Sequence, residues 1–259
     1  MSRITQRGAT SPLAIVANGA FQTSTDASLA TLVGTRWDLS DGREVILVNA
    51  SSATTVAPGK VYQNAANIAD HTNLAVTAFT AYSNNGNIPA KVTVTLGATA
   101  VTANQYAGGF LTGSDGTGEG QICRIASHPA ADASASLVVT LEEGPLTAFV
   151  ASASEVSLTA PTGKNIIITP TTTSTSVAIG LAIYAIAASS YGFLLTKGIG
   201  NALADSTNPV IGNAIAASKI TAGAVGSVSY ATNVLTDSVI GVALVTGVST
   251  EYRPVYVNL

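Results

Sequence analysis

The sequence predicts an all-β protein, built as an antiparallel sandwich or barrel, from three observations. Short stretches alternate between apolar and polar residues, as half-buried strands do, and 91–96 is the clearest of them. β-branched residues dominate the other short apolar stretches. Turn-forming sequences, such as 84–87 and 114–116, recur about every 10–15 residues. Helical patterns are few, and only 65–69 suggests a short helical turn.

The expected strands follow one another with turn residues between them. Gly42 begins one after an Asp-Gly turn, and the stretches near the C-terminus end the series. In chain order we expect strands at 42–48, 91–96, 137–141, 165–169, 239–245 and 254–257.

The stretch 165–196 carries no charged side chain. Its most apolar part, 177–188, has 12 residues, whereas a membrane-spanning helix needs about 20. Isoleucine and valine are frequent there, and glycine, serine and threonine interrupt or flank the stretch. We therefore expect two buried strands joined by a short turn, and no membrane partner.

Composition shifts suggest three parts. Residues 1–36 contain few large apolar side chains and are expected to form an extended N-terminal arm, either ordered by a partner or frayed. Alanine and serine dominate 147–159, so a boundary is placed there. The expected division is an arm at 1–36, a central β domain at 37–155 and a C-terminal β domain at 156–259.

The composition excludes several classes of protein. One cysteine cannot form a disulfide framework, and with two histidines it supplies at most three zinc ligands. The 11 Lys and Arg residues are scattered and outnumbered by 14 Asp and Glu, which disfavours nucleic-acid binding. The N-terminus shows no secretory signal pattern, so we expect synthesis in a cytoplasm.

No residue pattern predicts catalysis. His71 follows Asp70, but neighbouring strand residues face opposite sides, and His128 precedes a proline. The pair Glu142-Glu143 is interpreted as a charged strand end. The glycine-rich stretch 113–120 lacks the lysine of a phosphate-binding loop and is expected to be a hairpin loop, with a weak cation site at Asp115 and Glu119 as the alternative. We therefore expect no enzyme, no catalytic, cofactor-binding or metal-binding residue, and no cofactor.

The charge content is unusually low, at 10% against about 25% in ordinary domains. A protein that is packed against neighbours needs fewer surface charges, because an unpaired ion buried in a contact is costly. This favours a structural subunit of an assembly. The scattered aromatic residues are expected to fill the core or to anchor contacts; they are Trp37, Tyr82, Tyr106, Tyr191, Tyr230, Tyr252 and Tyr256.

Several longer stretches carry a family resemblance, in style and order, from about Asp41 to the C-terminus. They are 56–62, 94–106, 191–198, 240–243 and 251–256. Together they resemble virion proteins of tailed bacteriophages, of the small β-rich capsid decoration (cement) kind.

The resemblance implies a non-enzymatic protein on the outside of a phage head, a homotrimer that bridges major capsid subunits and stabilises the shell. Its partners would be the major capsid protein and itself, with no nucleic acid and no membrane, and its location the virion. The main alternative is a phage tail or baseplate protein with receptor or glycan binding. A glycan hydrolase and a cellular surface or storage protein are further alternatives.

Overall fold

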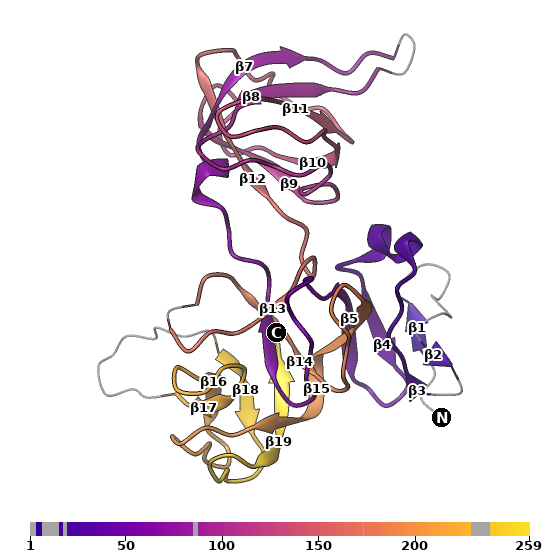
Figure 1. The fold of residues 1–259 in the computed structure, drawn as a ribbon, viewed down its shortest axis with the longest axis vertical. Helices are drawn as coiled ribbons and strands as arrows, with labels where there is room; N and C mark the ends of the chain where they lie inside the picture. Colours follow the sequence, from indigo (N-terminus) through magenta and orange to yellow (C-terminus); the bar gives the residue numbers. More distant parts are fainter. Residues whose placement is uncertain (1–3, 7–15, 18–19, 85–87, 173, 229–238) are drawn as a thin grey trace. The chain divides into compact units, whose positions relative to one another are not determined.

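The computed structural model describes residues 4–6, 16–17, 20–84, 88–172, 174–228 and 239–259. These residues form strands β1–β19 and two short 3-10 helices, and every pairing between named strands is antiparallel (Figure 1). The chain divides into two compact units: the sheet unit, Met1–Ala66 with Thr162–Leu259, and the barrel unit, Asn67–Pro161.

The sheet unit contains an eleven-stranded sheet and the small β2–β3 pair. The main path through the sheet runs β1-β4-β5-β15-β19-β18-β16-β17, and β6, β13 and β14 pair off this path. The elements are β1 (Ile4–Gln6), β2 (Val16–Ala17), β3 (Ala20–Phe21), η2 (Ala27–Leu32), β4 (Arg36–Leu39), β5 (Glu44–Asn49), β6 (Val61–Gln63), β13 (Ile167–Ile168), β14 (Ala178–Ala182), β15 (Tyr191–Leu203), β16 (Ala214–Ala217), β17 (Val225–Ser227), β18 (Val239–Ala243) and β19 (Tyr252–Asn258).

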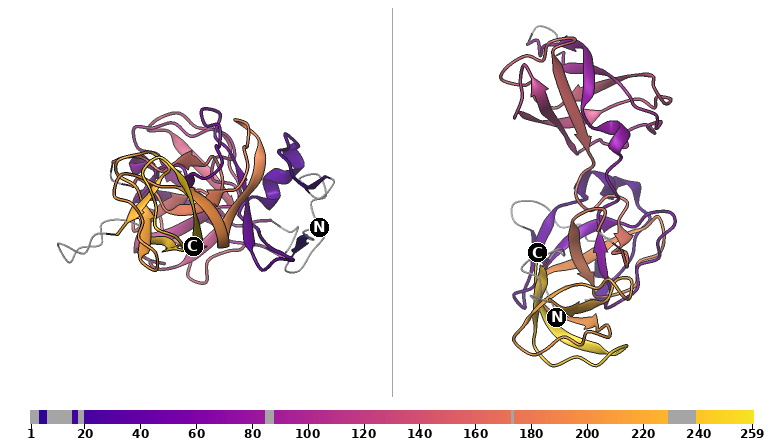
Figure 2. Two further views of the ribbon diagram at one scale, coloured as in Figure 1. Left: turned by 90° about the horizontal axis from the view of Figure 1, so that it is seen from below. Right: turned by 90° about the vertical axis from the view of Figure 1, so that its left-hand side faces the viewer.

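The barrel unit is a closed six-stranded barrel in the order β10-β11-β8-β7-β12-β9, seen from two further sides in Figure 2. Alternate residues of its strands point inward, as in β8, where Val92 and Val94 are buried and Lys91 and Thr95 are exposed. Its elements are η3 (Ala69–His71), β7 (Leu74–Thr80), β8 (Lys91–Thr95), β9 (Phe110–Gly116), β10 (Ile122–Ser127), β11 (Ser136–Leu141) and β12 (Ser154–Thr159).

The barrel unit is an insertion between two paired strands of the sheet unit. β6 precedes the insertion and β13 follows it, and they pair with Tyr62 opposite Ile168 and Gln63 opposite Ile167. The Gly163 N–H donates to Asn64 Oδ1 at 2.8 Å, which holds the two ends of the insertion together. The two segments by which the chain leaves and re-enters the sheet unit are therefore hydrogen-bonded to each other.

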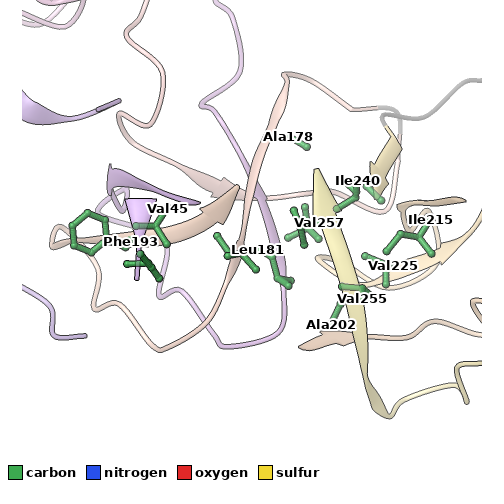
Figure 3. Packing of buried hydrophobic residues seen from close by; sticks show 14 of the residues in the cluster. Val45, Ala178, Leu181, Phe193, Ala202, Ile215, Val225, Ile240, Val255 and Val257 are labelled. Atoms are coloured by element: carbon green, nitrogen blue, oxygen red, sulfur yellow. The ribbon is translucent and has the colours of Figure 1, made fainter. Parts of the chain in front are cut away.

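Each unit has its own core. In the sheet unit, Trp37 packs edge-to-face on Phe193 at 5.2 Å between ring centroids. Side chains of β14, β15, β18 and β19 continue this core, as Figure 3 shows for Leu181, Val255 and Val257. The barrel core draws all its buried residues from 74–158, so neither hydrophobic cluster needs residues of the other unit.

The fold class predicted from sequence is confirmed, and its division differs. The stretch 165–196 contains β13, β14 and the first residues of β15, so strands are found there as expected, but the connection from β14 to β15 spans 183–190 and is longer than the short turn predicted. However, the boundaries between the two units lie at 66/67 and 161/162 in the sequence, not at 36/37 and 155/156. The reason is that β4 and β5 pair with β15, which lies beyond the insertion.

The described part of the expected arm is also folded into the sheet unit. Phe21 stacks on Tyr184 at 5.4 Å, Leu29 is buried, and Ser24 pairs with Tyr191 through backbone hydrogen bonds. Residues 1–3, 7–15 and 18–19 lie outside the described residues.

We predict that residues 67–161, excised, fold as an independent domain, because their core and strand pairings are self-contained. Thermal unfolding followed by circular dichroism should show one cooperative β-sheet transition. As a control, the fragment 37–155 should not fold cooperatively, since it lacks residues 156–159 of β12, which close the barrel against β9, and it separates β5 and β6 from β15 and β14. A cooperative transition in the control fragment alone would contradict this division.

Candidate interaction surfaces

The two histidines belong to a buried polar network in the barrel unit. His71 Nε2 lies 2.9 Å from the Thr99 carbonyl oxygen, and its Nδ1 lies 2.5 Å from the Tyr106 hydroxyl. A carbonyl only accepts, so Nε2 carries the proton and Nδ1 accepts from Tyr106. Burial raises the pKa of Tyr106 to about 12, so its hydroxyl remains a donor at neutral pH.

His128 continues the same network. Its Nε2 accepts from the Tyr106 backbone N–H at 3.0 Å, and its Nδ1 donates to the Pro129 carbonyl at 2.8 Å. Asn104 Oδ1 accepts from the His128 backbone N–H at 3.1 Å. The network therefore fixes the irregular segment between β8 and β9 against η3 and the end of β10. Both imidazole rings therefore form hydrogen bonds to backbone groups of this segment or its neighbours.

Asp70 also supports this segment rather than forming a pair with His71. Its carboxylate accepts from the Thr99 hydroxyl at 2.5 Å, and its carbonyl accepts from the Gly97 N–H at 3.0 Å. A Cβ on Gly97 would lie 2.7 Å from that carbonyl oxygen, so only glycine permits the approach.

The carboxylate pair expected from sequence lies at a strand end, as interpreted. Glu142 and Glu143 directly follow β11 and are exposed, and Glu142 Oε1 lies 3.4 Å from Arg124 Nε. A different pair of carboxylates meets across strands: Asp115 of β9 is opposite Glu155 of β12. Both line a cavity of about 260 Å³. Sequence reasoning missed this pair, because 40 residues separate its members.

The glycine-rich stretch forms the β9–β10 hairpin, as expected. The Gly113 N–H donates to the Gln121 carbonyl, and the Gly120 N–H donates to the Gly113 carbonyl. Among the described residues, no group of three or more His, Cys, Asp or Glu side chains could hold a metal ion. Cys123 is buried in the barrel core, and burial raises the pKa of its thiol.

The sheet unit exposes an apolar outer face, formed by three adjacent strands. Ile199 of β15 lies opposite Tyr256 of β19, and Tyr256 lies opposite Val242 of β18. All three side chains are exposed, by 58%, 39% and 39% respectively. The neighbouring positions Tyr252 and Leu244 are exposed as well. Ile199, Tyr256, Val242, Leu244, Pro254 and Tyr252 are called the outer face below.

A cavity of about 640 Å³ adjoins the outer face. Ile199, Tyr252 and Pro254 line it together with Ile183 and the turn at 57–59. Arg43 is its charged residue, and that guanidinium is bound to Asp41 at 2.7 Å. The cavity is therefore largely apolar, with its one cation already paired.

The barrel unit exposes apolar side chains of its own. Leu146 is fully exposed, although its loop is held in place: the Gln121 side-chain amide accepts from the Thr147 N–H at 2.9 Å and donates to the Thr147 carbonyl at 3.0 Å. Ile122, next to Gln121, is 63% exposed. Leu146 and Ile122 are thus two large apolar side chains that the barrel unit holds in exposed positions.

The aromatic residues divide between buried and exposed positions. Trp37 and Tyr106 are buried in the two cores, and Tyr191 is half-buried. Tyr82, Tyr252 and Tyr256 are exposed, and the last two belong to the outer face. Tyr230 lies outside the described residues.

No protein-family model, curated protein or solved structure matches this chain. Within the described residues, no helix has the length and apolar character needed to cross a membrane.

We predict that Tyr106→Phe lowers the free energy of unfolding by about 1–3 kcal/mol, because it leaves the buried Nδ1 of His71 without a donor. Urea denaturation should measure this loss. Tyr82→Phe is the matched control, since that side chain is 46% exposed, and it should change stability much less. Equal stability of the Tyr106→Phe variant and the wild type would contradict the network.

We predict that Glu155→Gln raises the free energy of unfolding by about 0.2–1 kcal/mol, because it removes like charges that lie directly opposite. The comparison variant Glu142→Gln removes a charge that faces Arg124 and should leave stability unchanged or lower it slightly. Chemical denaturation at pH 7 and low salt should show a gain in stability for Glu155→Gln and no gain for Glu142→Gln. A loss of stability in Glu155→Gln would show that the carboxylate has a favourable partner.

Proposed function

We propose that the protein is a non-enzymatic structural component of a phage virion, which decorates the outside of the head and stabilises the shell by bridging major capsid subunits. In this proposal it acts as a homo-oligomer, with the trimer expected from the resemblance. The resemblance to capsid decoration proteins suggests the location, and the surface of the chain supports the mechanism.

The observation that carries the proposal is that two separately folded units each expose large apolar side chains. The sheet unit presents the outer face, and the barrel unit presents Leu146 and Ile122. A protein that bridges neighbours needs more than one contact surface. Large exposed apolar patches on a soluble chain usually mark such surfaces.

The low charge supports the same mechanism. With a net charge of −3 over 259 residues, many copies repel one another little when they are held close together on one particle. Each bound copy adds the free energy of its own contacts to the work of separating the capsid subunits beneath it. Because many copies act on one shell, modest individual affinities sum to a large stabilisation.

We predict that purified virions contain roughly one-third to one copy of this chain per major capsid subunit, as symmetric decoration of the shell requires. Quantitative mass spectrometry against the capsid protein measures this ratio. Heads that lack the protein should also release their DNA at lower temperature, and adding back the purified chain should restore the wild-type value.

A ratio of a few per cent would contradict decoration and favour the alternative of a tail or baseplate protein. Equal DNA-release temperatures with and without the protein would contradict the stabilising role even at high copy number. Absence from the particle would overturn the virion assignment altogether.

A further inference from the structure

We infer that the outer face of β15, β19 and β18 is a self-association surface, occupied by a second copy of this chain. The inference deepens the proposed function, since it rests on the homo-oligomer proposed there. It goes further by naming the surface through which copies meet.

The register of the three strands places the apolar side chains in rows across the sheet. Ile199, Tyr256 and Val242 form the first row. In the next row Pro254 lies opposite Asn201, and the Leu244 N–H donates to the Pro254 carbonyl at 3.2 Å. Tyr252 follows, opposite Leu203. Figure 1 shows the three strands side by side.

These side chains do not serve the core of their own unit. The alternate residues of the same strands point inward, and Val255, Val257 and Ile240 are completely or almost completely buried. Figure 3 shows them packed within the core. Folding of the sheet unit therefore does not explain why the outward positions carry Ile, Tyr and Val, which cost free energy in contact with water.

The size of the surface fits a protein contact. The exposed fractions of five of these residues, all except the half-buried Pro254, correspond to roughly 450 Å² of surface, the size of the largest patch on a typical monomer. Loops beside Leu244 add Val245, Val248, Val210 and Ile211, all at least two-fifths exposed. The sum approaches the ~800 Å² per partner that a stable interface buries.

The charges around the outer face favour a second copy over a charged partner. Lys197 and Glu44 pair at one end of the strands, with 3.4 Å between Nζ and Oε1. Arg43, which lines the adjoining cavity, pairs with Asp41. The rim thus carries balanced charge. A rim without excess charge suits a second copy of this weakly charged chain better than a strongly charged partner.

The form of the surface also suits a copy of itself. Sheet faces with large apolar side chains pack on other sheet faces, at a separation of about 10 Å. Within the part of the chain that the structure describes, the outer face is the site where three adjacent strands align exposed apolar residues in one row.

The test compares the purified wild-type chain with Tyr256→Lys by sedimentation velocity and light scattering at micromolar concentrations. The wild type should be a closed oligomer. Tyr256→Lys should be monomeric, with association at least about 100-fold weaker, because it places an unpaired charge in the contact. Ile199→Lys provides a second, independent variant, and circular dichroism checks that both fold.

Ile88→Lys is the matched control, since it puts the same charge on a 47% exposed isoleucine of the barrel unit that belongs to neither proposed contact surface, and it should leave the oligomer intact. A monomeric wild type would overturn the inference, and so would an oligomer that persists in both outer-face variants. Virion copy number is measured separately. If the wild type forms the oligomer but is absent from virions, the inference about this surface stands and only the proposed function is refuted.

Discussion

The sheet unit depends on the pairing of one long strand, the 13-residue β15. Its first half pairs with β5, which precedes the inserted barrel, and its second half pairs with the C-terminal β19. β14 pairs with it as well. One strand therefore gathers segments from the whole length of the chain. Gly200 lies within it, and a Cβ there would come within 2.6–2.7 Å of Leu181 and Leu195, so the glycine permits the core to close beneath the strand.

The strands could be predicted from the sequence better than their partners. Alternation and β-branched residues are local signals, and they identify β8, β11 and β19 close to their observed bounds. Which strands pair is a non-local property, however. β6 has three residues, too few to show a pattern, and the predicted strand at 165–169 contains β13 but gives no sign of its partner, yet the pairing of β6 with β13 makes 67–161 an insertion. A split by composition alone therefore divided the chain at the wrong places.

The same limit applied to the functional surfaces. The low charge content, which favours a protein that packs against neighbours, can be counted directly in the sequence. The outer face required the register of three strands, since Ile199, Tyr256 and Val242 are neighbours only through β15, β19 and β18. His71 and His128 were judged unsuited to catalysis from their sequence neighbours. That both are hydrogen-bonded to Tyr106 could be seen only from the tertiary structure.

The two covalent connections of the barrel unit bear on the proposed mechanism. A domain added at a chain end hangs from one linker, so a force on it is borne by that single segment. Here both ends of the insertion run into strands of one hydrogen-bonded sheet, and β6 is also paired with β14. A pull on the barrel is shared between these strands. Such an attachment suits a protein that bridges subunits under load, because the contact surfaces of the two units then remain joined when either is strained.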